Sequence, residues 1–301
     1  MSEGPLRLEG PSTGPLSMFD QWEDHFELFA FIDGMHRAYE RFAEFADPAR
    51  LVAMGHLVLV GGPPGVGKSS FIARCARLLV REIGMARPMI FDFGQAAGYR
   101  ESADFGDMSK KLLRGMVDVL ESADWIHLEE LETLRGLVGD PETAHHRFSI
   151  MLKEADAVAV VILPQQIPLE WVRRFHELAR PRMIFFAECG PVDPDEENRR
   201  FGVIPLRRTT VLGLTAMRDR PRDVQEILKK RVKGMSAPEM KLVAEGVVVP
   251  FDAVAEAVIE LEHLFTSCGE GEITPEKLAP YTRESVDRLL ARLARTRRSD
   301  G

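Results

Sequence analysis

Five short apolar runs are spread over the first 215 residues of this 301-residue chain, and segments with helical periodicity separate them. The runs cover residues 57–60, 88–93, 157–163, 182–187 and 209–214. Short apolar runs of this kind between turn residues are typical of buried strands, and strands that alternate with helices form a parallel sheet. The run 157–163 is apolar at every position, as expected for a strand that is covered on both faces. The pattern predicts an α/β core with a five-stranded parallel sheet.

The pattern changes after residue 215, where no apolar run of comparable strength follows. Helical periodicity continues instead over 222–232, 237–244, 251–265 and 275–294, where Thr274 and Pro275 form a capped start. We therefore expect a core at 18–215 and a small all-helical domain at 216–301. Residues 1–17 are rich in Gly, Pro and Ser, which predicts a disordered lead-in or a docking tail.

The first apolar run leads directly into the pattern G-x-x-x-x-G-K-S at residues 62–69, and a helical pattern follows it. Strand, loop and helix in this order are the context that the Walker A phosphate loop requires. Glycines let backbone N–H groups surround an anion, and the helix N-terminus adds partial positive charge. Lys68 is expected to reach the β- and γ-phosphates and Ser69 to bind Mg²⁺. The predicted nucleotide contacts are Gly62, Pro63, Pro64, Gly65, Val66, Gly67, Lys68, Ser69 and Ser70.

Composition narrows the class of protein. Hydrophobic residues make up 45% and charged residues 29% of the chain, as in ordinary globular proteins. The net charge of −8 argues against a generally basic surface for nucleic acid. The three cysteines have no metal-type spacing, no apolar stretch is long enough for a bilayer, and no basic-then-apolar leader opens the sequence. These features predict a cytoplasmic protein without a membrane partner.

Two further groups of residues are candidates for binding. The aromatic-rich segment 19–45 is expected to be mostly core, but Phe31 and Ile32 lie just upstream of the phosphate loop and are candidates for contact with a nucleotide base. His145 and His146 are adjacent, so their side chains point in different directions on a helix. We expect them to be surface residues rather than a metal pair.

Taken together, the phosphate loop, the five strands and the helical end resemble the AAA+ ATPases, and most of all their initiator, transposition-regulator or STAND-like clades. The junction from 211–214 to 222–232 is similar to the family's last strand and first lid helix, and 272–276 resembles the start of its last lid helix. The resemblance implies ATP and Mg²⁺ between core and lid, and an arginine finger from a neighbouring subunit. Arg199 and Arg200 precede the fifth strand, where the family places that finger, although a surface pair in a charged loop is an equal alternative.

The chain departs from the family where hydrolysis is concerned. The family's Walker B motif ends in Asp-Glu, but the third predicted strand is followed by Leu163-Pro164-Gln165-Gln166. Gln165 can orient a water molecule, yet it provides neither the charge of a metal ligand nor a base. Glu188 or Cys189 takes the place of the expected sensor residue, and 251–265 contains no Gly-x-Arg.

Two acids are candidates to replace the missing one. Met89–Asp92 is an apolar run that ends in Asp, which is the Walker B form when the acidic strand lies next to the phosphate-loop strand. That arrangement would make Asp92 a Mg²⁺ ligand and would indicate a kinase- or GTPase-like protein. Glu188, at the end of the fourth strand, is the second acid that could approach a γ-phosphate.

Three functions follow from these residues. The first is an ATP-binding switch or assembly factor with weak or no hydrolysis, which acts on a protein partner or on a second copy through the nucleotide site. The second is an active ATPase that remodels a protein or nucleoprotein complex with Asp92 or Glu188. The third is an interaction module that holds its nucleotide permanently. The sequence leaves the enzymatic activity open, and nucleic acid enters only by family analogy.

Overall fold

A computed structural model of the chain describes residues 9, 16, 27–32, 34–82, 87–94, 97–99, 101–123, 125–165, 167–191, 208–215, 220–246, 254–268, 273–279 and 281. The chain forms two compact units. The sheet unit comprises residues 37–62 and 74–213, and the loop-and-lid unit comprises residues 1–36, 63–73 and 214–301.

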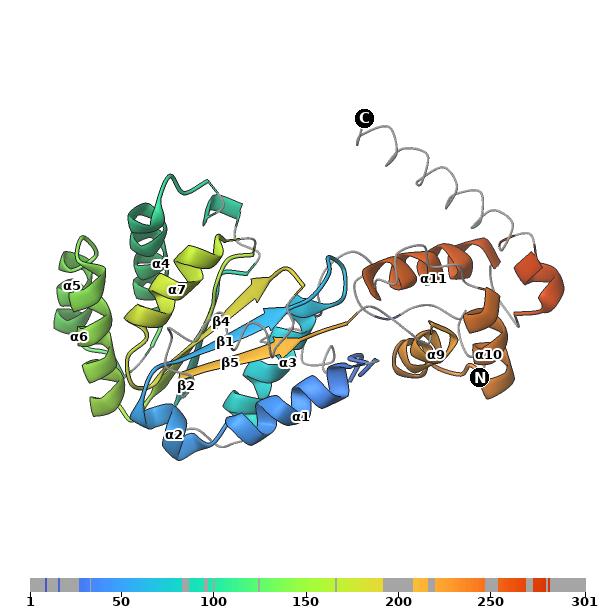
Figure 1. Cartoon of the computed structure of the whole chain (residues 1–301), viewed down its shortest axis with the longest axis horizontal. Coiled ribbons are helices and arrows are strands. Elements are labelled where there is room, and N and C mark those ends of the chain that lie inside the picture. Colours follow the sequence, from blue (N-terminus) through green and yellow to red (C-terminus); the bar gives the residue numbers. More distant parts are fainter. Residues whose placement is uncertain are drawn as a thin grey trace. The chain divides into compact units, whose positions relative to one another are not determined.

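The sheet unit is built on five parallel strands, which confirms the predicted α/β core (Figure 1). They are β1 (His56–Gly61), β2 (Pro88–Asp92), β3 (Val158–Ile162), β4 (Met183–Cys189) and β5 (Thr209–Gly213). Their order across the sheet is β2-β3-β4-β1-β5, so β2 and β5 form the edges. All residues of β1 and β3 are buried, as their continuous apolar sequences require.

Helices cover both faces of the sheet. One face is covered by α4 (Phe105–Leu120), α6 (Pro141–Glu154) and α7 (Leu169–Leu178), and α5 (Leu128–Gly136) packs on α4 and α6 (Figure 1). These helices share one hydrophobic core with the odd-numbered residues of β1 and β4. The other face meets α1 (Met35–Phe45) and α2 (Pro48–Ala53). There the Phe42 ring lies 5.7 Å from that of Phe186, and the Phe45 ring lies 5.1 Å from that of His56.

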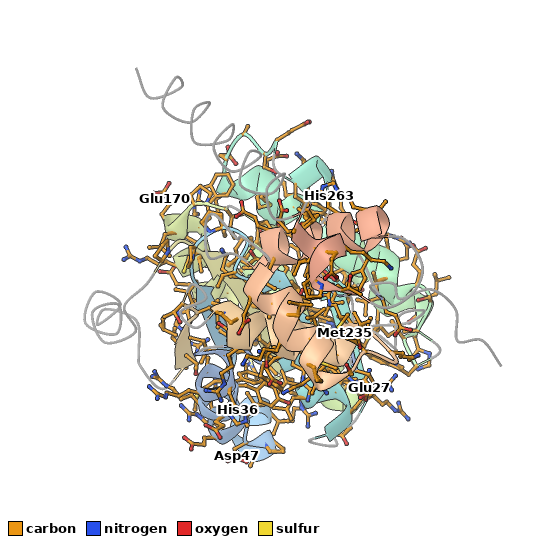
Figure 2. The ribbon with its side chains drawn as sticks, turned by 90° about the vertical axis from the view of Figure 1, so that its right-hand side faces the viewer. Glu27, His36, Asp47, Glu170, Met235 and His263 are labelled. Carbon is orange, nitrogen blue, oxygen red and sulfur yellow. The ribbon has the colours of Figure 1, made fainter. Side chains whose placement is uncertain are left out.

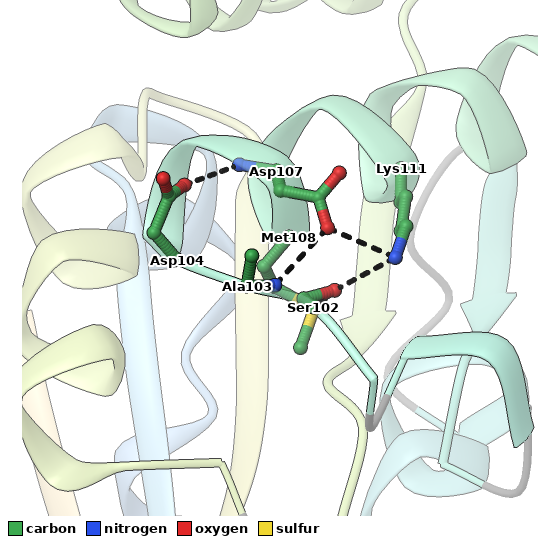
Figure 3. A network of polar contacts seen from close by, with 6 residues as sticks. All are labelled: Ser102, Ala103, Asp104, Asp107, Met108 and Lys111. Carbon is green, nitrogen blue, oxygen red and sulfur yellow. Dashed lines mark hydrogen bonds and ion pairs between the residues drawn. The ribbon is translucent and has the colours of Figure 1, made fainter.

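Local polar contacts fix the start of α4. Asp104 caps the helix because its Oδ1 accepts a hydrogen bond from the Asp107 N–H at 2.8 Å. Asp107 in turn accepts from the Ala103 N–H and pairs with the Lys111 ammonium at 2.9 Å (Figure 3). The hydrogen bond from Lys111 is the main reason why the pKa of Asp107 lies below its usual value. We assign this network to helix capping.

The loop-and-lid unit contains α9 (Arg220–Arg231), α10 (Ala237–Gly246) and α11 (Val254–Cys268), in agreement with the predicted all-helical end. Apolar residues of these helices form its core, and Met235, between α9 and α10, is buried as well. Figure 2 labels Met235. Tyr281 donates a hydrogen bond to the Glu260 carboxylate at 2.8 Å inside this core. The same unit holds residues 63–73, which include the first residues of α3 (Lys68–Arg77). Among the described residues, none of the helices is long and apolar enough to cross a membrane.

Candidate functional site

The phosphate loop, residues Gly62–Ser69, begins where β1 ends. The Gly62 N–H donates to the Gly190 carbonyl at 3.1 Å and so extends the pairing of β1 with β4 by one residue. Gly65 and Gly67 have φ values of 75° and 92°, a region that strongly favours glycine. α3 begins at Lys68, so the loop turns directly into a helix. The sequence therefore folds locally as its motif predicts.

This loop has the chemistry of an anion site. The first N–H groups of a helix have no partner within the helix, and they carry partial positive charge. The Lys68 ammonium donates to the Pro63 carbonyl at 3.0 Å, which places the amine over its own loop. Ser69 lies in the same first turn and contributes a hydroxyl. These groups fit a phosphate chain and one ligand of a Mg²⁺ ion. Within the described part of the chain, no three His, Cys, Asp or Glu side chains come together to hold a metal by themselves.

Glu188 lies one strand away from β1. In the pairing of β1 with β4, Val60 stands opposite Glu188 and Gly61 opposite Cys189. The side chains of Glu188 and Cys189 are half-buried at the carboxyl edge of the sheet. Neighbouring strands are about 4.8 Å apart. Among the acids considered from the sequence, Glu188 is therefore on the strand nearest to the one that leads into the phosphate loop.

The end of β3 has no acid. β3 ends at Ile162, and Leu163 and Pro164 are buried, while Gln165 is half-buried in the following turn. One strand, β4, separates β3 from β1. The position where a Walker B acid would stand is thus well formed and carries no carboxylate.

The position of Asp92 contradicts the kinase- or GTPase-like alternative. That alternative requires β2 to lie next to β1, but β2 is at the edge and two strands separate the pair. Three strand spacings amount to about 14 Å. Asp92 is exposed at the end of β2, yet partial desolvation raises its pKa, and the Gly94 N–H, which donates to its Oδ1 at 2.9 Å, works in the opposite direction. A role for Asp92 as a Mg²⁺ ligand remains an untested prediction that no longer has this support.

The candidates for contact with a base lie in the loop-and-lid unit. Ile32 is buried and Phe31 half-buried, with its ring 5.5 Å from that of His36. Met35 reaches the phosphate loop, because a Cβ on Gly67 would come within 3.2 Å of its Cε. Met35 therefore lies beside the loop, and contact of Phe31 or Ile32 with a base stays a prediction. Figure 2 shows His36 at the start of α1.

Solved structures with the same fold include three that match along most of the chain. They are a chain of Drosophila ORC bound to DNA (TM-score 0.52, 93% of this chain and 68% of that chain), Aeropyrum pernix ORC1 in complex with DNA (0.52, 85% and 66%) and C. elegans PCH-2 (0.54, 89% and 73%). Each is 13% identical to this chain, and similarity at this level of identity shows a shared fold alone. All three are AAA+ ATPases. The chain has an AAA+-like P-loop fold.

Sequence comparison agrees with this AAA+-like fold. The chain is 30% identical over 131 residues to Lon protease homolog 1, mitochondrial, of Arabidopsis thaliana, and 32% identical over 126 residues to Lon protease 2 of Bdellovibrio bacteriovorus. Each alignment covers 40% of this chain, but only 13% and 15% of the two Lon proteins. No model of a known protein family matches the chain.

Some site residues remain untested, and others were missed. Arg199, Arg200 and Gln166 lie outside the described residues. No motif predicts the contact between α11 and the phosphate loop, where the Ala255 N–H donates to the Gly65 carbonyl at 3.1 Å. The prediction that His145 is a surface residue is wrong, because it is buried and its Nδ1 lies 3.3 Å from the Leu178 carbonyl oxygen.

Proposed function

We propose that this AAA+-like protein binds ATP with Mg²⁺ and acts as a nucleotide-dependent switch or assembly factor with weak or no hydrolysis. One observation carries the proposal. The strand end that binds phosphate, at β1, has its complete loop, whereas the end of β3 lacks the acid that hydrolysis uses.

Each group in the loop has a definite role in binding. Lys68 would exchange its hydrogen bond to Pro63 for the β- and γ-phosphate oxygens, and the Ser69 hydroxyl would join the coordination of Mg²⁺. The metal supplies charge neutralisation for the phosphate chain. Phe31 and Ile32 would pack against the base, where aromatic and aliphatic surface favours a flat ring.

The contact of α11 with the loop supports a switch. Because the Ala255 N–H donates to the Gly65 carbonyl, any change in the loop's backbone also changes the anchorage of α11. A ligand shifts an equilibrium only by its difference in affinity for the two states. Nucleotide that favours one loop conformation would therefore favour one arrangement of the helices α9–α11.

The output of the switch would be a surface offered to a protein partner or to a second copy of the chain. Arg199 and Arg200 are the candidates to reach a neighbour's nucleotide. Two of the similar structures contain DNA, but their similarity to this chain is one of fold. Binding of nucleic acid is an analogy that the net charge of −8 does not favour.

The position of Glu188 favours a second candidate, an active ATPase. Its carboxylate is on the strand adjacent to β1, and a base on this edge could activate water. The two candidates differ in turnover. In an active enzyme, Glu188→Gln would remove most of the steady-state ATP hydrolysis while ATP binding stayed within about twofold, because the amide keeps the shape and removes the base. The switch predicts no turnover for Glu188→Gln to remove.

Titration of the full chain with ATP and Mg²⁺ tests binding itself. Lys68→Ala removes a charge-assisted hydrogen bond to phosphate and is expected to weaken binding by about 100-fold. Lys153→Ala, at an exposed position at the end of α6, is the matched control and should bind like the wild type. Equal affinity for the wild type and Lys68→Ala would refute a nucleotide site in this loop.

A further inference from the structure

The described residues of the N-terminal segment, Glu9 and Leu16, both contact other parts of the loop-and-lid unit. Leu16 reaches the first turns of α3, and Glu9 reaches the end of α9. The two contacts lie on elements that are far apart in the sequence. A segment rich in Gly, Pro and Ser gives no hydrophobic periodicity from which either contact could be predicted.

The Leu16 contact is at the nucleotide loop. Its N–H donates to the Ser70 Oγ at 2.8 Å, and its side chain is only 3% exposed. Ser70 directly follows Ser69, the predicted Mg²⁺ ligand, in the sequence G-K-S-S. The second hydroxyl of the motif is therefore engaged by the N-terminal segment.

The Glu9 contact is at the end of α9. Its N–H donates at 2.9 Å to the carbonyl of Arg231, the last residue of that helix, whose carbonyl has no partner within the helix. Its carboxylate also lies 3.1 Å from the Lys233 ammonium. Lys233 is 86% exposed, so this ion pair contributes little energy. Glu9 is thus the weaker of the two anchors.

The length of chain between the two anchors limits the distance between the end of α9 and the first turns of α3. Glu9 and Leu16 are seven residues apart, which spans at most about 25 Å when fully extended. While both anchors hold, the end of α9 cannot move farther than this from the first turns of α3. A larger separation requires one anchor to release.

We propose that the N-terminal segment is a strap that ties α9 to the start of the phosphate-loop helix and thereby slows the release of bound nucleotide. The effect on nucleotide rests on the proposed function, whereas the docking of the strap does not. Because Ser70 is next to Ser69, an occupied Leu16 anchor stabilises the first turn that holds the metal and the phosphates. Loss of the strap loosens that turn.

The release rate of a fluorescent ATP analogue with Mg²⁺ from the full chain tests the strap. Leu16→Asp places a charge at a buried position and is expected to raise the release rate about threefold to tenfold. Leu128→Asp makes the same exchange at a leucine that is 69% exposed on α5, and it should release the analogue like the wild type. Equal rates for Leu16→Asp and the wild type would overturn the proposal.

Two further measurements cover the other outcomes. If Leu16→Asp does not fold, Lys233→Glu tests the proposal instead, because it places a second carboxylate beside that of Glu9. This variant should raise the release rate about twofold. The double variant Glu9→Lys, Lys233→Glu exchanges the two charges and should restore the wild-type release rate. If the wild type binds no nucleotide, the proposed function fails while the strap is still tested by hydrogen exchange. Protection of the amides of Glu9 and Leu16 that Leu16→Asp abolishes supports the strap, and rapid exchange of both in the wild type contradicts it.

Discussion

The carboxyl ends of β1 and β3 lie on the same edge of one sheet, with only β4 between them, yet they are equipped very differently. β1 leads into a phosphate loop with both left-handed glycines, a lysine and a serine in place. β3 ends in Leu163, Pro164 and Gln165, none of which carries a charge. Both strands are fully buried, so the difference is one of chemistry and not of fold.

Nucleotide binding and nucleotide hydrolysis depend on different strand ends. Binding needs the loop of β1, which provides N–H groups, a helix terminus and one cation. Hydrolysis needs in addition a group that holds the metal or activates water, and the fold leaves a place for it at β3 without providing it. This contrast between the two strand ends is the basis on which we propose a switch.

The largest expected effect comes from completing the end of β3. Pro164→Asp with Gln165→Glu puts the two acids of the family motif directly after the apolar run 160–163. We expect ATP turnover about 100-fold above the wild-type level, because a positioned base contributes at least that factor. Steady-state phosphate release measures it.

The uncharged double variant Pro164→Asn, Gln165→Gly is the control for this gain, and it should stay at the wild-type level. If ATP turnover is already high in the wild type and the added acids do not raise it, another acid in the protein activates water or holds the metal.

Breaking the end of β1 should have the next largest effect. Gly67→Val forces a branched side chain into a residue with φ of 92° and brings its Cβ within 3.2 Å of Met35. The strain should weaken ATP binding about tenfold to thirtyfold, as measured by titration. Gly139→Val is the control, since a Cβ at Gly139 meets no atom within 4 Å. Unchanged binding in Gly67→Val would show that this loop conformation is not the one that binds.

The pH dependence of the free energy of unfolding tests the packing around the sheet, independently of the two strand ends. Burial lowers the pKa of both His145 and His176 to about 4, with Arg180 and Arg208 respectively adding to the effect. Both rings stay neutral in the folded protein, while in the unfolded chain they take up protons below about pH 6.5. The free energy of unfolding should therefore fall with pH from about 6.5 down to about 4.

Between pH 7.5 and 5.5 we expect a loss of about 2 kcal/mol in the free energy of unfolding, measured by denaturant titration. His176→Gln should remove about half of this dependence, whereas His146→Gln, at an exposed position, should leave it unchanged. Stability that is constant over this range in the wild type would contradict buried neutral histidines.

The sequence predicts the sheet well because its strands are continuous apolar runs, such as 157–163, and the loop because G-x-x-x-x-G-K-S needs one conformation. It does not predict strand order by itself, and the kinase-like alternative for Asp92 fails on order alone. Contacts such as Ala255 with Gly65 or Leu16 with Ser70 are made by backbone N–H groups, which every residue except proline has. Such backbone contacts cannot be predicted from a pattern of side chains. His145 is misjudged because a histidine that bonds to a carbonyl can lie in a core.

As a switch, the chain would hold ATP and hydrolyse it slowly or not at all. The most direct test mixes the full wild-type chain, in excess, with radiolabelled ATP and Mg²⁺, and follows the bound nucleotide over hours at several protein concentrations. We expect that the bound nucleotide remains ATP at every concentration and that Lys68→Ala binds almost none. Conversion of the bound ATP to ADP within minutes, faster at higher protein concentration, would contradict it and would identify an ATPase that is completed by assembly.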